Sequence, residues 1–338
     1  MTRRVLLTGA DGFIGSHCLD HFLATTDWQV VCVNSWSHGG FAERIVESHF
    51  AQHRDRVEIH THDLALPLSD LLLRRISPID AVVHFAAESH VDTSIQQSRM
   101  VVENNVACTL TVLEAARILK PEIVIQISTD EVYGPAEGDD SHPEWSPLLP
   151  SNPYSGSKAA QEVIAHSYWR THGVPVVITN GMNSIGERQP PEKFLPMVIR
   201  RVLRGEHLDL HASPDRREVG SRNYLHARNH ADACRWLIER GRVGQFPAAD
   251  RPDRWNIPGQ SRLSNLVFAQ RVAGFIGKPL LSRLVDGNTG RPGHDLHYGL
   301  DGSKITAAGW NHPVPFDAAL EKTVQWYLRN LDWLELAP

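Results

Sequence analysis

The chain has 338 residues, of which 41% are hydrophobic and 22% are charged, so it has the length of one large domain plus a smaller one. A net charge of -5 and a pI near 6.4 give no basic footprint for a nucleic-acid partner. The four cysteines lie far apart without a CxxC pair, which fits neither a disulfide framework nor a thiolate metal site and indicates a reducing, cytoplasmic location. An apolar run long enough for a membrane span or a signal-peptide core is absent from the sequence.

The first half of the chain alternates β-rich runs with helical runs. Such short and almost wholly apolar runs are typical of parallel strands buried on both faces; they occupy residues 5–8, 30–33, 57–60, 81–85, 123–128 and 176–179. Helices are predicted between them, notably at residues 14–24, 102–119 and 154–171. The sequence therefore predicts an α/β fold with a doubly wound parallel sheet. From about residue 181 the pattern loosens and ends in an amphipathic segment, residues 316–328, which indicates a smaller second lobe with a ligand cleft between the two.

A glycine-rich loop follows the first predicted strand. Gly9 permits a tight turn, Gly12 lets the backbone approach a pyrophosphate, and Gly15 lets the helix pack close to the strand. Phe13 and Ile14 are expected to bind the cofactor together with these glycines, at the N-terminus of a helix whose free N–H groups and dipole favour an anion. Because this triplet sits at a strand-to-helix junction, we expect a Rossmann-type dinucleotide site rather than a plain turn.

The place of the usual ribose-binding acid, at the end of the second strand, is held by Asn34. Asparagine can bind a hydroxyl but has no charge to repel a 2'-phosphate, so NAD is expected without NADP being excluded. After the third strand, Asp63 and Leu64 are expected near the adenine ring, although a loop or capping Asp is an equal alternative for Asp63.

Two further motifs carry chemistry. Tyr154 and Lys158 stand four residues apart at a helix start, so they share one face, and a neighbouring ammonium would stabilise a phenolate that takes a hydroxyl proton. The run STDEVYG places Asp130 and Glu131 side by side. Successive residues of a strand point to opposite faces, so both acids can serve one substrate only if the strand ends there.

Taken together, these motifs resemble those of the extended short-chain dehydrogenase/reductases, and within them the dTDP-glucose 4,6-dehydratase family. The resemblance runs nearly end to end, through TGADGFIGS, HFAAESHVDTSI, STDEVYG, NPYSGSKAA, TNGMNSIGERQPPEKFLP, RNYLHARNHADA, RPGHDLHYGLD and EKTVQWYLRN. It implies a Rossmann domain over residues 1–180, with return segments near 223–257, and a lobe over 181–338 that mainly binds substrate. The acidic doublet is its most discriminating part, since related epimerases typically carry other residues there.

The resemblance also implies roles. Tyr154 would deprotonate the sugar C4 hydroxyl as hydride passes to nicotinamide, while Thr129 would donate a hydrogen bond to the C4 oxygen. Glu131 would remove the C5 proton, and a protonated Asp130 would give a proton to the departing C6 hydroxyl. For the sugar nucleotide, it implies substrate-binding residues at Ser89, His90, Asn183, Glu192, Lys193, Arg222, Asn256 and Arg291.

Some positions depart from the family pattern. Asn34 replaces Asp, Thr93 stands where Arg is frequent, and residues 227–230 read ARNH instead of VEDH. These departures leave open whether the base is thymine, uracil or another. The alternatives are a 5,6-dehydratase that forms an exocyclic alkene, a 4-epimerase, and, from a different class, a non-catalytic NAD-binding protein.

Two expectations remain. His49 and His53 have helical spacing but no metalloenzyme partners in the sequence, so we assign no metal. The predicted helices at 102–119 and 154–171 resemble the pair through which this superfamily dimerises, so a homodimer is expected, with neither a nucleic-acid nor a membrane partner.

Overall fold

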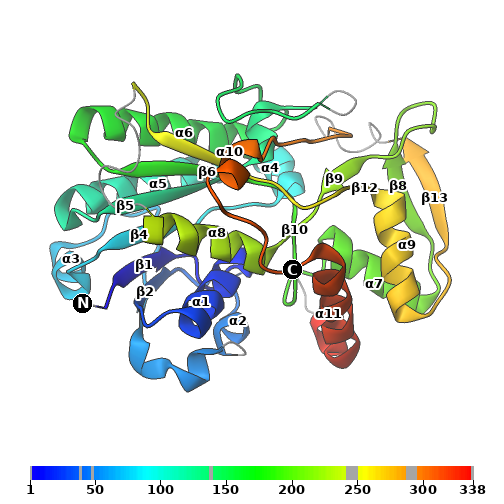
Figure 1. Ribbon diagram of the computed structural model, residues 1–338, viewed down its shortest axis with the longest axis horizontal. Coiled ribbons are helices and arrows are strands. Elements are labelled where there is room, and N and C mark those ends of the chain that lie inside the picture. Colours follow the sequence, from blue (N-terminus) through cyan, green and yellow to red (C-terminus); the bar gives the residue numbers. More distant parts are fainter. Residues whose placement is uncertain are drawn as a thin grey trace.

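The computed structural model describes residues 2–37, 40–46, 49–136, 140–240, 250–286 and 295–335. Seven parallel strands form the central sheet in the order β11-β6-β5-β4-β1-β2-β3 (Figure 1). Their bounds are β1 (Arg4–Thr8), β2 (Gln29–Asn34), β3 (Val57–Thr61), β4 (Ala81–His84), β5 (Ile123–Thr129), β6 (Val176–Gly181) and β11 (Asp253–Ile257). The predicted doubly wound α/β fold is confirmed.

Helices cover both faces of this sheet, which explains its apolar strands. Along β1, Val5 and Leu7 belong to the apolar cluster beneath α1 (Phe13–Thr25) and α8 (Ala227–Arg240). Leu6, between them, belongs to the cluster beneath α5 (Ser98–Leu119) and α6 (Pro153–His172) on the other face (Figure 1). Successive side chains of a strand point to opposite faces, so a strand buried on both sides has to be apolar throughout.

The strand order reverses between β1 and β4, which are neighbours in the sheet. At such a point the connections leave in opposite directions, and a crevice opens beyond the carboxyl ends of the strands.

Six strands of the sheet were predicted to within two residues at each end. β11 was not predicted as a strand, because Asp253, Arg254 and Asn256 interrupt its apolar pattern.

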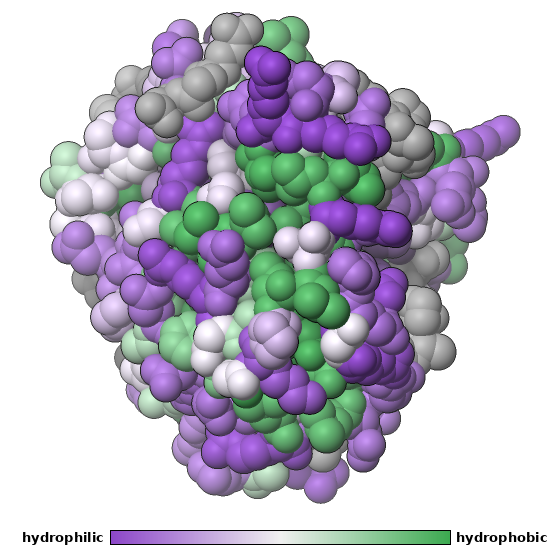
Figure 2. Space-filling model, turned by 90° about the vertical axis from the view of Figure 1, so that its right-hand side faces the viewer, coloured by the Kyte–Doolittle hydropathy of each residue, from purple (hydrophilic) through white to green (hydrophobic). Residues whose placement is uncertain are grey.

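A third apolar cluster lies on the right of Figure 1, around α7 (Phe194–Arg204), α9 (Asn265–Ile276) and α11 (Phe316–Arg329). A parallel pair, β8 (Leu208–Ala212) and β13 (Ser282–Asp286), packs beside them. Figure 2 looks onto the outer face of this part, where apolar side chains are exposed between charged ones. The shorter elements are α2 (Ala42–Val46), α3 (Asp70–Ile76), α4 (Val91–Gln96), α10 (Ser303–Ala307), β7 (Ser184–Ile185), β9 (Ser221–Asn223), β10 (Leu225–His226), β12 (Arg262–Ser264) and the 3-10 turns η1 (His49–Gln52), η2 (Arg54–Arg56), η3 (Asp130–Tyr133) and η4 (Leu331–Glu335).

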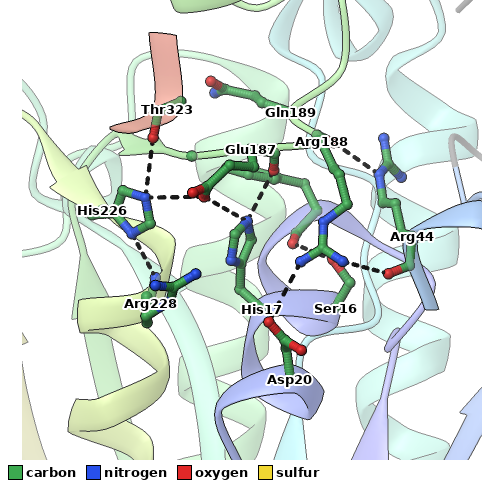
Figure 3. A network of polar contacts seen from close by, with 12 residues as sticks. Ser16, His17, Asp20, Arg44, Glu187, Arg188, Gln189, His226, Arg228 and Thr323 are labelled. Carbon is green, nitrogen blue, oxygen red and sulfur yellow. Dashed lines mark hydrogen bonds and ion pairs between the residues drawn. The ribbon is translucent and has the colours of Figure 1, made fainter. Parts of the chain in front are cut away.

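A buried polar network joins the two parts (Figure 3). His17 of α1 has its ring Nε2 2.9 Å from the carbonyl oxygen of Glu187, in the loop after β7. The Glu187 carboxylate lies 3.3 Å from the ring of His226 on β10, which also contacts Thr323 of α11. Histidine and carboxylate side chains are seldom buried without partners, so these contacts fix the loop after β7 against the start of α1.

The same network has a second branch (Figure 3), in which two arginines exchange hydrogen bonds. Arg44 of α2 donates to the carbonyl of Arg188 at 3.0 Å, and Arg188 donates to the carbonyl of Arg44 at 2.8 Å. Arg188 also lies 3.9 Å from the carboxylate of Asp20 on α1. The guanidinium groups therefore act as buried cross-links between main-chain segments far apart in sequence.

Among the residues that the structure describes, no helix is long and apolar enough to cross a bilayer. Over the same ranges, no group of three or more His, Cys, Asp or Glu side chains is arranged to hold a metal ion. His49, considered as a ligand, instead has its ring Nδ1 2.6 Å from Asp20. All four cysteines are buried and free.

Candidate active site

A cavity of about 820 Å³ lies at the carboxyl edge of the sheet, where the strand order reverses, and continues toward the third apolar cluster, around α7, α9 and α11. Its walls come from the loop after β1, the ends of β2, β4 and β5, the start of α6, and the segment from β6 to α7. Every predicted site residue that the structure describes, except Asn256, lines this cavity. The volume suits a ligand bound between a nucleotide-binding sheet and a second lobe.

The glycine loop has the close contacts that require glycine. A Cβ on Gly15 would lie 2.0 Å from the carbonyl oxygen of Gly9, and one on Gly9 would lie 2.9 Å from the main-chain nitrogen of Ala86. Gly9 also has a φ of +69°, which glycine adopts without strain. Gly12 is the N-cap of α1 and has no side chain to occupy the free N–H groups of the first turn. The main chain at Gly12, Phe13, Ile14 and Gly15 therefore forms a cradle open to an anion.

Asn34, Asp63 and Leu64, which we expect to bind the adenosine, line the cavity. Asn34 is 2% exposed, and its side-chain oxygen accepts a hydrogen bond from the Ala10 N–H at 2.9 Å. Its amide nitrogen is buried and has no hydrogen-bond partner among the described residues. The Asp63 carboxylate accepts from the Ala65 N–H at 2.9 Å, so the loop-capping role considered for this residue is present in the structure.

The acidic doublet lies where the chain leaves the sheet. β5 ends at Thr129, and Asp130 and Glu131 open the 3-10 turn η3. Thr129 caps this turn: its hydroxyl accepts the Glu131 N–H at 3.3 Å and donates to Asp130 Oδ1 at 2.9 Å. Because the turn replaces the strand alternation, both carboxylates line the same cavity, as the sequence predicted.

The two acids differ in their surroundings. Burial, together with the neighbouring Glu131, raises the pKa of Asp130 to about 7. Within the described ranges Asp130 Oδ2 is buried and has no hydrogen-bond partner, which suits a protonated carboxyl group. Burial also raises the pKa of Glu131, but a hydrogen bond from Asn152 and the charges of Arg222 and Lys193 act in the opposite direction. Arg222, Lys193 and the Asn152 amide therefore favour the carboxylate form of Glu131, whereas the surroundings of Asp130 favour its neutral, protonated form.

Tyr154 and Lys158 lie in the first two turns of α6 and line the cavity together. The Lys158 ammonium donates to the carbonyl of Ile127 at 2.7 Å, and burial lowers its pKa to about 8. Burial and the carboxylates of Glu131 and Asp130 raise the pKa of Tyr154, while a hydrogen bond with Thr129 opposes the rise. The expected lowering of the Tyr154 pKa by Lys158 is thus not what this structure has, because the two acids are the charges that the phenol meets.

The cavity is also lined by the residues that we expect to bind the substrate, Ser89, His90, Asn183, Glu192 and Lys193. His90 has its Nδ1 2.9 Å from the hydroxyl of Thr93, and burial with the nearby Lys193 lowers the His90 pKa. Burial also lowers the Lys193 pKa, against the charges of Glu192 and other acids. This end of the cavity therefore combines one buried cation with carboxylates.

Arg222 also lines the cavity, on β9. Its guanidinium donates to the carbonyls of Ser221 and Asp295, each at 2.8 Å, and to that of Leu296. It lies 4.4 Å from the ring centre of Tyr298. These bonds hold the guanidinium in place and use several of the donors that a diphosphate would need.

Two predicted substrate residues stand apart. Asn256 does not line the cavity: its amide donates to the carbonyls of His142 (2.8 Å) and Asp301 (3.1 Å), and its oxygen accepts from Tyr133 (3.3 Å). The prediction for Asn256 is therefore corrected to a structural role in joining the loops around β11. Arg291 lies outside the described residues.

Sequence reasoning missed several cavity residues. Glu88 accepts the Ser89 and His90 N–H groups at 2.9 and 3.0 Å and shapes the turn after β4. The Tyr298 hydroxyl lies beside Arg222, is buried, and has no hydrogen-bond partner among the residues that the structure describes. Asp11, inside the glycine loop, also faces the cavity. Asn152, just outside the cavity lining, caps α6 and contacts Glu131; an Asn before Pro at a helix start was the available signal for it.

The family model of the NAD dependent epimerase/dehydratase family matches residues 5–257. The chain belongs to this family. Curated relatives include a dTDP-glucose 4,6-dehydratase of Neisseria meningitidis, 33% identical over 98% of this chain and 95% of that protein. Another is the low-salt glycan biosynthesis protein Agl12 of Haloferax volcanii, 34% identical over 96% of this chain and 98% of that protein.

Solved structures of family members have the same fold. DesIV, the dTDP-glucose 4,6-dehydratase of Streptomyces venezuelae with NAD and TYD bound, superimposes with a TM-score of 0.85 at 33% identity, covering 98% of this chain and 99% of that one. A UDP-glucose 4-epimerase of Thermus thermophilus in complex with NAD gives a TM-score of 0.81 at 25% identity, covering 96% and 99%. Both dehydratases and epimerases are thus among its structural neighbours.

Proposed function

We propose that this protein is an NAD-dependent nucleoside-diphosphate-hexose 4,6-dehydratase, a hydro-lyase that converts a dTDP-glucose or UDP-hexose type substrate to the 4-keto-6-deoxy sugar. The observation that carries the proposal is that Asp130 and Glu131 line the same cavity as Tyr154. An epimerase needs hydride transfer at C4 alone, whereas water elimination across C5 and C6 needs both a base and an acid.

The cavity fits the cofactor. The glycine cradle suits a pyrophosphate, the unpartnered Asn34 amide suits a ribose oxygen, and Asp63 and Leu64 lie at the adenosine end. When bound, NAD supplies hydride chemistry, taking hydride from sugar C4 and returning it to C6. Lys158, fixed against Ile127, would contact the nicotinamide ribose.

The chain's own groups divide the proton transfers. Tyr154 accepts the C4 hydroxyl proton, and Thr129 donates a hydrogen bond to the C4 oxygen. The resulting ketone acidifies C5, from which Glu131 removes the proton. Asp130 gives its proton to the C6 hydroxyl, which departs as water. When hydride then adds to C6, a proton returns to C5, which completes the 4-keto-6-deoxy sugar. The raised pKa of Asp130, about 7, supports its role as the acid at neutral pH.

The remaining assignments concern substrate binding. Ser89, His90, Asn183, Glu192 and Lys193 would hold the sugar, and Arg222 would face the diphosphate with the donors left by its main-chain bonds. Residues 1–180, with return segments near 223–257, would bind NAD, and 181–338 would mainly bind substrate.

The test is a panel of dTDP-glucose and UDP-hexoses followed by proton NMR. The expected product loses water and has a C6 methyl signal. An exocyclic methylene signal would mean a 5,6-dehydratase, and an unchanged mass with a new C4 configuration would mean a 4-epimerase. Binding of NAD without turnover of any substrate would leave a non-catalytic protein and overturn the proposal.

Two variants separate the steps. Glu131→Gln should lower product formation by about 10²–10⁴-fold, the usual contribution of a general base, while absorbance of reduced nicotinamide still appears on substrate addition. Tyr154→Phe should suppress both signals. If Glu131→Gln forms product at the wild-type rate, elimination does not use this acid.

We also propose a cytoplasmic homodimer. Four buried free cysteines are compatible with a reducing compartment. Leu110 and Ile118 on α5 and Val163 on α6 are large apolar side chains exposed to solvent, which a second copy packed on these helices would cover. Light scattering after size exclusion should give the dimer mass at micromolar concentration; a monomer mass would contradict the assembly.

A further inference from the structure

The adenosine end of the cavity has an acid that does not come from the end of β2. Asp11 belongs to the glycine loop, is 5% exposed, and lines the cavity together with Asn34, Ser35 and Ser37. Its carboxylate accepts the main-chain N–H of Trp36 at 3.2 Å, so it lies directly against the turn that follows β2. A Cβ on Gly40 would come within 2.1 Å of the same carboxylate, which leaves no room for a side chain there.

Asn34 contributes the complementary group. Its oxygen is held by the Ala10 N–H, so its amide nitrogen is the group left to meet a ligand, and this nitrogen is buried with no hydrogen-bond partner in the described part of the chain. A buried donor of this kind is costly unless a ligand oxygen accepts from it. The amide serves a ribose hydroxyl and a phosphate oxygen equally, so Asn34 alone does not distinguish NAD from NADP.

We propose that Asp11 is the residue that selects NAD against NADP. Its carboxylate, which lies in the glycine loop, would have the role that an acid at the end of the second strand has in other Rossmann sites. This inference rests on the proposed use of NAD. A 2'-phosphate on a ribose bound by Asn34 would meet this carboxylate in a part of the cavity largely closed to water, where like charges repel strongly.

Arg44 is the cation that faces the same region, and it could in principle neutralise such a phosphate. Its Nε donates to the Arg188 carbonyl at 3.0 Å and its Nη1 to the Asp11 carbonyl at 3.1 Å. It also contacts the ring of Phe41, 4.7 Å from the ring centre. The guanidinium is therefore held by main-chain and ring contacts. Burial raises the Asp11 pKa, while main-chain N–H groups, including that of Trp36, and the Arg44 charge act in the opposite direction and favour the carboxylate.

The test measures nucleotide selection without turnover. The purified protein is incubated with an equal excess of NAD and NADP until the bound fraction is constant, then desalted, and the bound nucleotide is quantified by chromatography. The wild type should hold NAD over NADP by roughly 50-fold or more, since a like-charge contact of this kind is typically worth one to two factors of ten. Asp11→Asn keeps an acceptor for the Trp36 N–H and should reduce the preference to within about fivefold.

Three further variants complete the design. Asp11→Ser should relax selection in the same way, so the result does not depend on one replacement being folded. Asp11→Asn combined with Asn34→Asp returns a carboxylate to the end of β2 and should restore the NAD preference. Asp27→Asn, an exposed acid between α1 and β2, removes the same net charge and should leave the preference unchanged.

Two results would overturn the inference. One is a wild type that holds NADP as well as NAD, and the other is an Asp11→Ser protein that melts normally yet keeps the wild-type preference. Neither result bears on dehydration, which is read from the sugar product by NMR. Conversely, a protein that selects NAD through Asp11 but turns over no sugar nucleotide would leave this inference standing and overturn the proposed function.

Discussion

The side-chain amide of Asn152 donates a hydrogen bond to Glu131 Oε2 at 3.3 Å, while its oxygen accepts the Ser155 N–H at 2.9 Å. Asn152 is the N-cap of α6, the helix that carries Tyr154 and Lys158. One residue thus connects the proposed base to the helix that holds the proposed hydride-transfer pair, and its amide is one of the groups that stabilise the Glu131 carboxylate.

Replacing Asn152 by Asp should preserve the cap but damage the base. Aspartate caps helices as well as asparagine does, so the free energy of unfolding should change by less than about 1 kcal/mol. The new carboxylate would face Glu131 and raise its pKa, so kcat should fall by roughly 10–100-fold at pH 7 and recover partly at higher pH. Ser264→Asp, at the N-cap of α9, is the matched control and should leave kcat unchanged. A pH profile identical to that of the wild type would remove Asn152 from the positioning of Glu131.

Asp130 should make stability and activity depend on pH in the same direction. The folded protein holds the Asp130 proton up to a pKa of about 7, whereas the unfolded chain loses it near 3.8, so this group's contribution to stability falls as pH rises through that window. The loss has a limiting slope of about 1.4 kcal/mol per pH unit. Urea unfolding of wild type and Asp130→Asn at pH 5 to 8 should therefore diverge, with the variant relatively more stable at high pH.

The same proton is the one proposed to leave with the C6 hydroxyl, so wild-type kcat should decline above about pH 7. Parallel unfolding curves for the two proteins would mean that Asp130 titrates normally in the folded state and would remove the physical basis for this acid assignment.

Arg254 should stabilise the buried polar contacts that reach the end of β5, next to the site. It pairs with Glu162, which accepts from Asn180 at 2.8 Å, and Asn180 also donates to the carbonyl of Thr129 at 3.1 Å. Both partners are at most 3% exposed, so Arg254→Met should cost about 3–5 kcal/mol by leaving the Glu162 carboxylate buried and unpaired. Arg99→Met, which breaks the exposed pair with Glu103, should cost less than about 1 kcal/mol. Equal losses for the two variants would show that burial of the Glu162 pair has no special weight.

The polar network of Figure 3 should depend on the charge of Glu187. Burial raises the Glu187 pKa, but the hydrogen bond from His226 and the electrostatic interactions with His17 and His226 outweigh it, so the pKa is lowered. Its contribution is therefore present above the unfolded pKa of 4.5 and is lost as pH falls below it. Glu187→Gln should cost about 1–3 kcal/mol at pH 7, and less near pH 4. Glu239→Gln, an exposed helical acid paired with Arg235, should stay within about 0.5 kcal/mol at both pH values; a similarly small loss for Glu187→Gln would contradict the network's role.

The parts of this protein that sequence predicts best are those where one physical rule decides. Strands buried on both faces must be apolar, and so β1, β2 and β4 to β6 were recognisable from their composition alone. The position of Asp130 and Glu131 at a strand end followed from the alternation of strand side chains. Every residue carried over from the nucleotide and sugar motifs that the structure describes, apart from Asn256, lies at one cavity.

What sequence did not predict depends on contacts between distant segments. Asn256 lies in β11, where its amide meets His142 and Asp301, and nothing local in the sequence indicates those partners. The rise in the Tyr154 pKa depends on burial and on two carboxylates that the fold brings to it from η3. Asp11 lies between the glycines of the loop without a local signal of its role, and the contact of its carboxylate with the Trp36 N–H places it beside the turn after β2.

The strand β11 has a consequence for how the protein is made. It supplies an edge of the central sheet beside β6, and α8 packs against α1, although both elements come after residue 226. A nascent chain that has emerged only as far as β6 therefore exposes an unpaired strand edge and an uncovered apolar layer. Both surfaces are prone to aggregate with other chains. Native pairing must wait for the ribosome to add about seventy more residues, so a heterologous host that translates slowly or lacks holding chaperones should yield insoluble material before it yields enzyme.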